Sequence, residues 1–392
     1  MKKMLIPALL VVLLAGCTDA DKDFIRENVK FAAEQVDRQI AVVEDSTGVV
    51  LNPVSLKDDG TVRYCKYSDW RSGFFPGTVW YLYELTGDEK YLPLARKYTE
   101  AISDVQYVTD NHDVGFMTMS GFGNGLRIAG IEEYKGVIVQ AARSLMTRFR
   151  PAPGVFQSWK ENPARDWKCP VIIDNMMNLE LLFKAFDLTG DSTFVSAAVS
   201  HADRTLKEHF RPDGSCYHVV DYDPESGEVR MRVTAQGFAD ESIWSRGQAW
   251  AVYGYAAMYR HTGDRKYLEQ SLKTFDMLRH HPALPEDCIF WWDMCAPDIP
   301  DAPRDASSAA IVASALYDIC TMDVDNPEQY KDFADRIMVS LSSPAYRAAP
   351  GENGNFILMH SCTHVPAGKE VDVPLNYADY YFLEALVRKS RL

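Results

Sequence analysis

Residues 83–91 read YELTGDEKY, and a run with helical spacing follows them at residues 92–102. The same pattern returns as FDLTGDSTF at residues 186–194 and as YRHTGDRKY at residues 259–267, each again ahead of a helical run. A degenerate copy occupies residues 323–330. Self-similarity of this kind indicates an architecture that repeats one unit of secondary structure.

The Thr-Gly-Asp core of these copies is typical of a turn between two helices. Glycine adopts the left-handed conformation that ends one helix, and the aspartate after it caps the next one. The aromatic residue three positions later would pack the turn against the core. Strand-like alternation is confined to short pieces such as residues 215–222 and 229–233. The pattern therefore predicts an all-α fold of helical hairpins with minor β-hairpin insertions.

A series of helical hairpins can close into a toroid or remain an open α-solenoid. The three copies begin at residues 83, 186 and 259, so they stand 103 and 73 residues apart, whereas solenoids keep a more uniform spacing. The loops between the copies are long and rich in aromatic residues, which is typical of loops that carry function. We therefore expect a closed toroid of inner and outer helices, with the open solenoid as the alternative.

The beginning of the sequence has the character of an export signal. The chain starts MKKM, and an apolar run of signal-peptide length follows at residues 5–15. Residues 13–17, LLAGC, resemble a lipobox in which Cys17 is acylated and becomes the mature first residue. We predict a lipoprotein signal peptide at residues 1–16 and a single mature domain at residues 17–392, with an ordinary secretory peptide as the alternative. The mature protein would be an exported lipoprotein, attached to a membrane only through its lipid anchor and facing the periplasm or the cell surface.

Composition and charge exclude some kinds of partner. The net charge is −14 at pH 7, which argues against nucleic acid and means that an anionic ligand must be met by a few local Arg or His side chains. Seven cysteines remain after Cys17 and none lies in a CxxC pair, so we expect neither a zinc site nor a functional disulfide. His360 and His364 have a metal-ligand spacing, but no third ligand stands near them in the sequence.

Unusual polar and aromatic residues gather in the loops that precede helices. These loops cover residues 67–77, 111–116, 171–178, 242–250 and 303–308. In a toroid whose alternate helices line the centre, the starts of the inner helices meet at one mouth. That arrangement would gather Asp113, Asp174, Arg246 and several tryptophans into one pocket.

Each of these residues also has a purely structural interpretation. Asp174 precedes a strong helix and would serve as its N-cap, and Asp113 would be a turn residue. His218 lies in a strand-like stretch and would be a satisfied core histidine. Arg246 and Trp250 share one helix face at a spacing of four residues, which is compatible with plain cation–π packing.

Three motifs occur in order along the chain: NHDVGF at residues 111–116, DNMMNL at residues 174–179 and SRGQAW at residues 245–250. With these motifs the chain resembles glycoside hydrolase family 88, the unsaturated glucuronyl hydrolases. The resemblance extends from near Trp70 to the closing segment at residues 376–386. It implies an (α/α)6 barrel that uses no metal and no other cofactor.

The resemblance also implies roles for individual residues. The two essential carboxylates of the family carry over to Asp113 and Asp174, with Asp174 as the general acid/base. The residues that would contact the substrate are Trp70, Phe74, Trp159, His218, Gln236, Trp244, Arg246 and Trp250. We expect Asp113 to raise the proton affinity of Asp174, and either Arg246 or His218 to bind the carboxylate of the substrate.

The implied substrate is an unsaturated uronic-acid oligosaccharide left by a polysaccharide lyase, with glycosaminoglycan-type disaccharides favoured. A proton added at C4 of the C4=C5 enol ether gives an oxocarbenium ion at C5. Water adds there, and the product opens and releases the neighbouring sugar. One carboxyl can serve twice, since it gives a proton to C4 and later takes one from water.

Other functions stay open at this point. An unsaturated rhamnogalacturonyl hydrolase of family 105 would share the fold and the aspartate. A conventional inverting glycosidase would use the same aspartates on an intact sugar. A sugar epimerase would depend on histidines, and a non-catalytic glycan-binding lipoprotein would need only the tryptophans. We favour the unsaturated-uronate function because it alone accounts for Asp113, Asp174 and Arg246 together. The identity, linkage and sulfation of the second sugar are not specified by the sequence.

Overall fold

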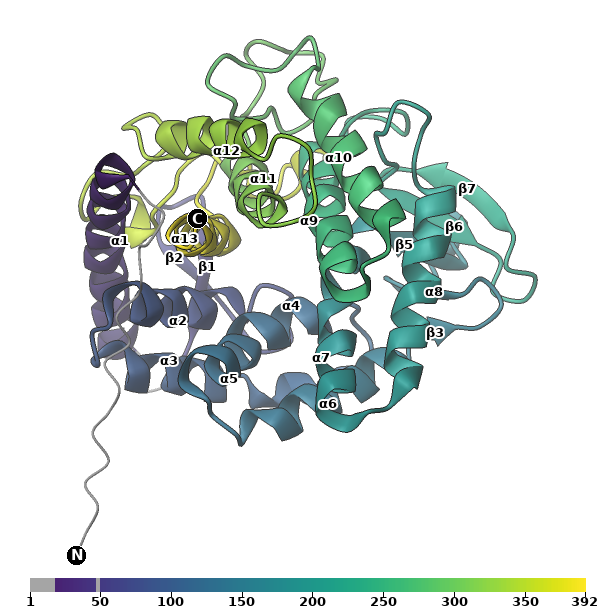
Figure 1. Ribbon diagram of the computed structural model, residues 1–392, viewed down its shortest axis with the longest axis horizontal. Helices are drawn as coiled ribbons and strands as arrows, with labels where there is room; N and C mark the ends of the chain where they lie inside the picture. The colour runs from purple at the N-terminus through teal and green to yellow at the C-terminus, as the bar shows by residue number, and fades with distance from the viewer. Residues whose placement is uncertain (1–17, 47–49) are drawn as a thin grey trace, which may run out of the picture.

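The computed structural model describes residues 18–46 and 50–392, so the predicted signal peptide and Cys17 lie outside the described residues. Its helices form two concentric rings around one axis (Figure 1). The inner ring consists of α2 (Phe74–Thr86), α4 (Val114–Thr118) with α5 (Asn124–Ala129), α7 (Glu180–Thr189), α9 (Ser245–Thr262), α11 (Ala306–Ile319) and α13 (Asn376–Lys389). The outer ring consists of α1 (Asp19–Ser46), α3 (Tyr91–Glu100), α6 (Tyr134–Met146), α8 (Ser192–Glu208), α10 (Arg265–Arg279) and α12 (Glu328–Leu341).

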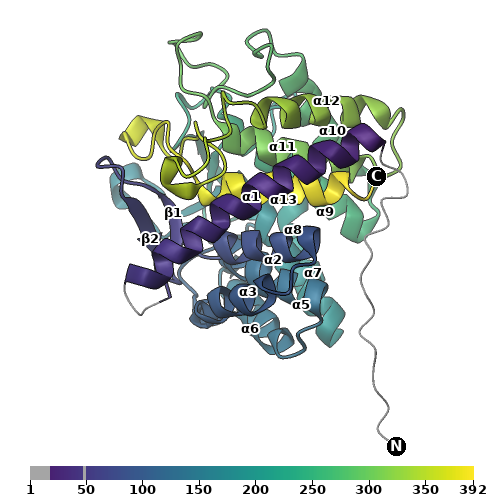
Figure 2. The same ribbon diagram turned by 90° about the vertical axis from the view of Figure 1, so that its left-hand side faces the viewer.

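The rings close on themselves. From α2 to α12, each inner helix or helix segment pair is followed in the chain by an outer helix, and α13 packs against α2 to join the last inner helix to the first. The first helix, α1, supplies the outer partner of α13: it crosses the outside of α13 and also contacts α2 (Figure 2). The prediction of a closed all-α toroid is therefore confirmed, and the open solenoid is excluded. The six pairs make an (α/α)6 barrel.

The Thr-Gly-Asp turns largely follow the prediction. Gly87, Gly190 and Gly263 end α2, α7 and α9 in the left-handed conformation, with φ angles of 64°, 73° and 68°. Asp191 and Asp264 then cap α8 and α10 by accepting a hydrogen bond from the backbone N–H two residues further on. Because these turns depend only on neighbouring residues, their sequence signal is reliable.

The first copy of the turn differs in one respect. Asp88 accepts a hydrogen bond from the backbone N–H of Lys90, but this contact closes a separate turn, because α3 begins only at Tyr91. The prediction that Asp88 caps this helix is therefore wrong. The aromatic residue of the motif is buried in all three copies, at Tyr91, Phe194 and Tyr267.

Within the described residues, three small sheets interrupt the helical rings. The largest has the antiparallel strand order β5-β6-β7 and consists of β5 (Cys169–Ile172), β6 (Val219–Tyr222) and β7 (Val229–Val233). The two hairpins are β1 (Asn52–Leu56) with β2 (Val62–Cys65), and β3 (Phe149–Arg150) with β4 (Val155–Phe156). The sequence predicts β6 and β7, although residues 215–218 are not strand, but it does not locate β5 or the other two hairpins.

The β5–β6 pair brings two distant segments of the chain together. Ile172 at the end of β5 pairs with Val219, and the next residue, Ile173, donates its backbone N–H to the carbonyl of His218 at 3.1 Å. A short 3₁₀ helix, η4 (Ile173–Asn178), starts at once and carries Asp174. His218 and Asp174 therefore lie side by side because of strand pairing, which no local sequence pattern encodes.

The inner helices begin at the same end of the barrel. Phe74 at the start of α2 contacts Tyr377 at the start of α13, with ring centroids 5.9 Å apart. Nη1 of Arg246, at the start of α9, lies 3.7 Å from Oδ2 of Asp305, and Asp305 caps the start of α11. The loops that lead into these helices therefore form a single rim, as predicted.

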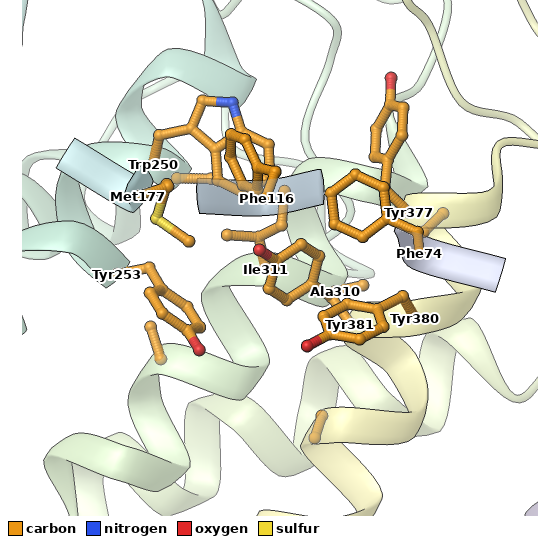
Figure 3. Close-up of a cluster of buried hydrophobic side chains, with 14 of the residues drawn as sticks. Phe74, Phe116, Met177, Trp250, Tyr253, Ala310, Ile311, Tyr377, Tyr380 and Tyr381 are labelled. Atoms are coloured by element: carbon orange, nitrogen blue, oxygen red, sulfur yellow. The ribbon is translucent and has the colours of Figure 1, made fainter. Parts of the chain in front are cut away.

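A layer of aromatic side chains closes the barrel below this rim (Figure 3). The layer consists of Phe74, Phe116, Trp250, Tyr377, Tyr380 and Tyr381. Ring centroids within it lie 5.1 Å apart for Phe116 and Trp250, and 5.3 Å apart for Phe74 and Tyr380. Below the layer is a cavity of about 490 Å³, lined by Phe116, Tyr380 and Tyr381 of the layer and, toward the far ends of the inner helices, by Arg260, Asp318, Glu384 and Arg388. The aromatic layer thus forms a floor between this cavity and the rim.

Candidate active site

Asp113 lies in the rim, directly before α4. Its backbone N–H donates to Oδ1 of Asn111 at 3.0 Å, which fixes the loop around it. Oδ1 of its carboxyl group is 3.5 Å from Nδ2 of Asn178, and Oδ2 is 3.4 Å from Nε2 of His112. Asp113 is therefore held between its own loop and the segment that carries Asp174.

Asp174 occupies the first turn of η4. The N-cap position belongs to Ile172, whose backbone is extended because it ends β5, and in the described chain the Asp174 carboxylate caps no backbone N–H. The interpretation of Asp174 as an N-cap is therefore wrong. Its Oδ2 atom is buried and has no hydrogen-bond partner among the described residues. This oxygen can therefore accept a hydrogen bond from a molecule bound beside it.

Burial raises the pKa of both carboxyl groups. The pKa of Asp174 rises from 3.8 to about 6 because burial disfavours its charged form, while the charge of Arg246 and the indole of Trp250 oppose the rise. Burial and the charge of Asp174 raise the pKa of Asp113 well above its usual range. Repulsion between two carboxylates is mutual, so each favours the protonated form of the other. The protonated pair is therefore favoured up to a higher pH than an isolated carboxyl group, which general acid catalysis requires.

His218 is a neutral hydrogen-bond donor beside Asp174. Its Nδ1 atom accepts from the backbone N–H groups of Ala235 and Gln236, both at 3.1 Å, so the ring proton resides on Nε2. Burial, followed by the charge of Arg246, lowers the pKa of His218 well below its usual range and keeps the ring uncharged. The interpretation of His218 as a satisfied core histidine therefore fits Nδ1 but not Nε2, which has no partner within the described residues.

Arg246 supplies a buried positive charge. Its Nη2 atom donates to Oε1 of Gln236 at 2.6 Å and to the carbonyl of Thr363 at 2.8 Å, and Nη1 donates to the carbonyl of Cys362. The nearest carboxylate, Asp305, lies 3.7 Å from Nη1, and burial raises the pKa of that carboxyl group. Neutral oxygens hold the guanidinium closely, so much of its charge stays available to an anionic ligand.

Two tryptophans form the wall around His218. The ring of Trp244 lies 4.4 Å from the imidazole, and the guanidinium of Arg246 lies 4.5 Å above the same indole. Trp159 meets the imidazole edge-on at 5.8 Å and stacks on Trp167 at 5.6 Å. Large flat aromatic surfaces next to fixed donors are the usual lining of a small-molecule pocket.

The remaining predicted residues lie in or above the aromatic floor. Phe74 and Trp250 are 0% exposed and belong to the floor itself (Figure 3). Trp70 is partly exposed and packs over it, with its ring centroid 5.0 Å from that of Tyr377. The predicted residues of the described chain therefore gather at one end of the barrel, with Phe74 and Trp250 in the floor below the others.

Sequence reasoning assigned no role to two buried polar residues of the site. Asp305 was recognised only as part of a loop, although it caps α11 and lies beside Arg246. Asn178 falls in the DNMMNL motif, four positions after Asp174, and contacts Asp113. Its spacing from Asp174 was the available signal, because residues four apart in a helical segment lie on the same face.

In residues 18–46 and 50–392, no group of three or more His, Cys, Asp or Glu side chains is arranged to hold a metal ion. The seven cysteines found there are free thiols. The same ranges contain no helix that is both long enough and apolar enough to cross a membrane.

Known proteins resemble the chain along most of its length. The sequence profile of Glycosyl Hydrolase Family 88 matches residues 54–389. The unsaturated glucuronyl hydrolase of Formosa agariphila is 47% identical over 326 residues, which cover 83% of this chain and 80% of that protein. The unsaturated glucuronyl hydrolase of Bacillus sp. strain GL1 is 34% identical over 345 residues, covering 85% of this chain and 90% of that protein.

Solved structures agree with these relatives. The crystal structure of an unsaturated glucuronyl hydrolase specific for heparin has a TM-score of 0.90 and 43% identity, covering 94% of this chain and 97% of that chain. A mutant of the unsaturated glucuronyl hydrolase from Streptococcus agalactiae, complexed with dGlcA-GalNAc6S, has a TM-score of 0.77 and 27% identity. That match covers 99% of this chain and 97% of the other.

Proposed function

The chain belongs to glycoside hydrolase family 88, and from this premise we propose that it releases the terminal 4,5-unsaturated uronic acid from lyase-generated oligosaccharides. Two relatives are unsaturated glucuronyl hydrolases, and a third was solved with dGlcA-GalNAc6S, so glycosaminoglycan-type disaccharides are the expected substrates. The observation that carries the proposal is the buried carboxyl pair of Asp113 and Asp174, next to the cation of Arg246.

Asp174 acts twice in the proposed reaction. It first gives its proton to C4 of the enol ether, which leaves a positive charge shared between C5 and the ring oxygen. It then takes a proton from the water that adds at C5, which restores the carboxylic acid. The hemiketal so formed opens and releases the neighbouring sugar. A group that both gives and retakes a proton works best with a pKa near the working pH, and burial brings the pKa of Asp174 to about 6.

Asp113 has a supporting role in this proposal. Burial and the charge of Asp174 raise its pKa and favour the protonated form, in which Asp113 donates a hydrogen bond to a ring hydroxyl of the uronic acid. A neutral Asp113 also leaves Asp174 as the only carboxylate of the pair when the proton leaves for C4. Two negative charges in this buried pair would oppose each other.

The carboxylate of the substrate belongs beside Arg246 and His218. Arg246 offers a full positive charge, whereas His218 offers an uncharged Nε2–H donor. A substrate carboxylate placed there would add negative charge near Asp174 and raise its proton affinity further. Substrate binding would thus favour the protonated acid that the first step needs.

The relatives support this function over the alternatives. Family 88 and its unsaturated glucuronyl hydrolases match most of the chain, which argues against a rhamnogalacturonyl hydrolase and against a non-catalytic binding protein. An epimerase that depends on a protonated histidine is disfavoured, because His218 is held neutral. A conventional inverting glycosidase differs from a hydrating enzyme in one observable respect: it would release the sugar while leaving the C4=C5 bond intact at first.

The deciding experiment follows the alkene. With a lyase-generated disaccharide, the ultraviolet absorbance of the conjugated C4=C5 bond should disappear in step with sugar release. Reaction in heavy water should place one deuterium at C4 of the product. A saturated disaccharide of the same composition is the matched control and should be inert, because it has no enol ether to protonate. Cleavage of the saturated disaccharide at a comparable rate would refute the proposal.

We further propose that the protein is an exported lipoprotein. The support is the sequence itself: an apolar run at residues 5–15 that ends in the lipobox-like LLAGC, with Cys17 as the acylated residue. Stable attachment needs more than one acyl chain, which a lipoprotein cysteine carries. The enzyme would then face the periplasm or the cell surface.

A further inference from the structure

Asn178 lies between the two chain segments that carry the carboxyl groups. It is the last residue of η4 and is 1% exposed. Its Nδ2 atom is 3.4 Å from the backbone carbonyl oxygen of Asp174 and 3.5 Å from Oδ1 of Asp113. Both distances are at the long end of the hydrogen-bonding range. One side-chain amide therefore links both members of the carboxyl pair.

A third contact fixes the orientation of this amide. Oδ1 of Asn178 accepts the backbone N–H of Phe116 at 2.8 Å. Because only the amide oxygen can accept and only the amide nitrogen can donate, this bond forces Nδ2 to face Asp113. Gly115 makes the close approach possible, since a Cβ atom at that position would lie 2.5 Å from Cα of Asn178.

The fixed amide determines where Asp113 carries its proton. A carboxylic acid that receives a donor on one oxygen keeps its own proton on the other, so the contact at Oδ1 leaves the proton on Oδ2. We propose that Asn178 is a positioning residue that holds Asp113 against the Asp174 segment and directs the proton of Asp113 to Oδ2. The inference rests on the proposed function, since it concerns the same reaction.

Other groups that face the pair must stay constant in any test that reads a pH dependence. They are Asp69, His112, Arg148, Cys216, His218 and Arg246. The two histidines are neutral, because burial lowers their pKa, to about 3 for His112 and well below the usual range for His218. A substitution at Asn178 leaves all six groups in the sequence, so a change in the pH dependence of kcat reports on the Asn178 amide.

The test compares Asn178→Asp with a matched control, Asn124→Asp. Asn178→Asp keeps the oxygen that accepts from Phe116 but replaces the donor toward Asp113 with an acceptor. Asn124 is 5% exposed, and its Nδ2 atom donates to the carbonyl of Ser120 at 3.0 Å and to the hydroxyl of Tyr380 at 3.2 Å. It lines the cavity below the aromatic layer, whose lining contains neither Asp113 nor Asp174. The two variants therefore make the same chemical change in different places.

We expect kcat on a lyase-generated disaccharide to fall roughly ten- to hundred-fold in Asn178→Asp, with little change in KM. The alkaline limb of the kcat profile should move to higher pH, because a third carboxylate raises the proton affinity of the pair. Asn124→Asp should keep both the wild-type kcat and the wild-type profile. A lower kcat with an unshifted profile in Asn178→Asp would overturn the positioning role.

Two further measurements keep the inference independent of folding and of the proposed function. If Asn178→Asp does not fold, Asn178→Ser replaces it in the test. Its side chain is too short to reach Asp113, so kcat should fall by a similar factor.

Failure of the proposed function would appear in the wild type, which would not consume the disaccharide. In that case, carboxyl ¹³C NMR titration without substrate would still test the inference, because it measures the pKa of Asp113 directly. The pKa of Asp113 should rise in Asn178→Asp and not in Asn124→Asp, and equal titration in all three proteins would overturn the inference.

Discussion

Nε2 of His218 lies 4.0 Å from Oδ2 of Asp174, and neither atom has a hydrogen-bond partner elsewhere in the described chain. The separation is too long for a direct hydrogen bond, yet a single oxygen atom placed between the two can bond to both. Since Nδ1 of His218 is occupied by two backbone N–H groups, Nε2 is the donor of this pair. The two residues therefore define a position for a substrate oxygen or for the water that adds at C5.

Asp174→Asn should abolish turnover without unfolding the protein. Asparagine has nearly the same shape, but it cannot give up and recover a proton. General acid–base assistance contributes roughly 10²–10⁴-fold, and Asp174 is proposed to act twice, so the loss in kcat should be at least this large. Initial rates of alkene loss would measure it, with circular dichroism as the check on folding. A variant that retains more than about a tenth of the wild-type rate would show that Asp174 is not the acid.

The same substitution should stabilise the protein at neutral pH. Burial raises the pKa of Asp174 from 3.8 to about 6, so the folded state binds this proton more tightly than the unfolded chain does. The resulting stability is complete below the unfolded pKa and is lost as pH rises through about 6, a loss of roughly 3 kcal/mol. Asparagine avoids this loss. Thermal melts should show a higher Tm for Asp174→Asn at about pH 7 and convergence of the two curves below about pH 4; parallel curves would contradict the burial argument.

Arg246 rather than His218 should meet the charge of the substrate carboxylate. Arg246→Gln should raise KM on the order of 10–100-fold for a free-acid disaccharide and much less for its methyl ester, because the ester has no charge to pair. His218→Gln keeps a neutral donor and should affect both substrates alike. Steady-state kinetics on the two substrates would distinguish the residues. A selective loss for the free acid in the His218 variant would assign the carboxylate to His218.

Cys17→Ser should change where the protein is found. If Cys17 carries the lipid anchor, the variant loses its acyl chains and should move from the membrane fraction to the soluble fraction, or keep an uncleaved signal peptide. Cell fractionation followed by mass spectrometry of the N-terminus would show either result. Unchanged membrane association with a normally processed N-terminus would exclude this anchor.

The repeating part of the fold could be predicted because its signals are local. The positive φ of Gly190 and the capping contact of Asp191 depend on a few adjacent residues, and the sequence contains all of them. The first copy shows the limit of this reasoning. Asp88 has the same neighbours in the motif, yet α3 begins later, so the aspartate caps a turn. A motif that repeats within the chain thus predicts a turn more reliably than it predicts the first residue of the following helix.

The chemistry of the site was less accessible from sequence. The resemblance to family 88 identified Asp113 and Asp174, but the N-cap interpretation of Asp174 failed because strand β5 extends the chain up to Ile172. The raised pKa of both carboxyl groups depends on their burial in the folded protein. The failed N-cap interpretation and the unpredicted burial both arise from tertiary contacts, which a pattern of residue types does not contain.

The helix pair that closes the barrel joins the first and the last helix of the described chain. Lys389 in α13 forms an ion pair with Asp21 in α1 at 2.5 Å, and Nε2 of Gln35 donates to the carbonyl of Phe356 at 3.2 Å. During synthesis α1 leaves the ribosome before the other described helices and its inner partner α13 leaves after them, so the ring cannot close until α13 has been translated. A ribosome that stops before residue 376 would release a protein whose apolar inner surface is open along one whole side. Such a product would be a target for chaperones and proteases, even though every residue proposed for catalysis had already been translated.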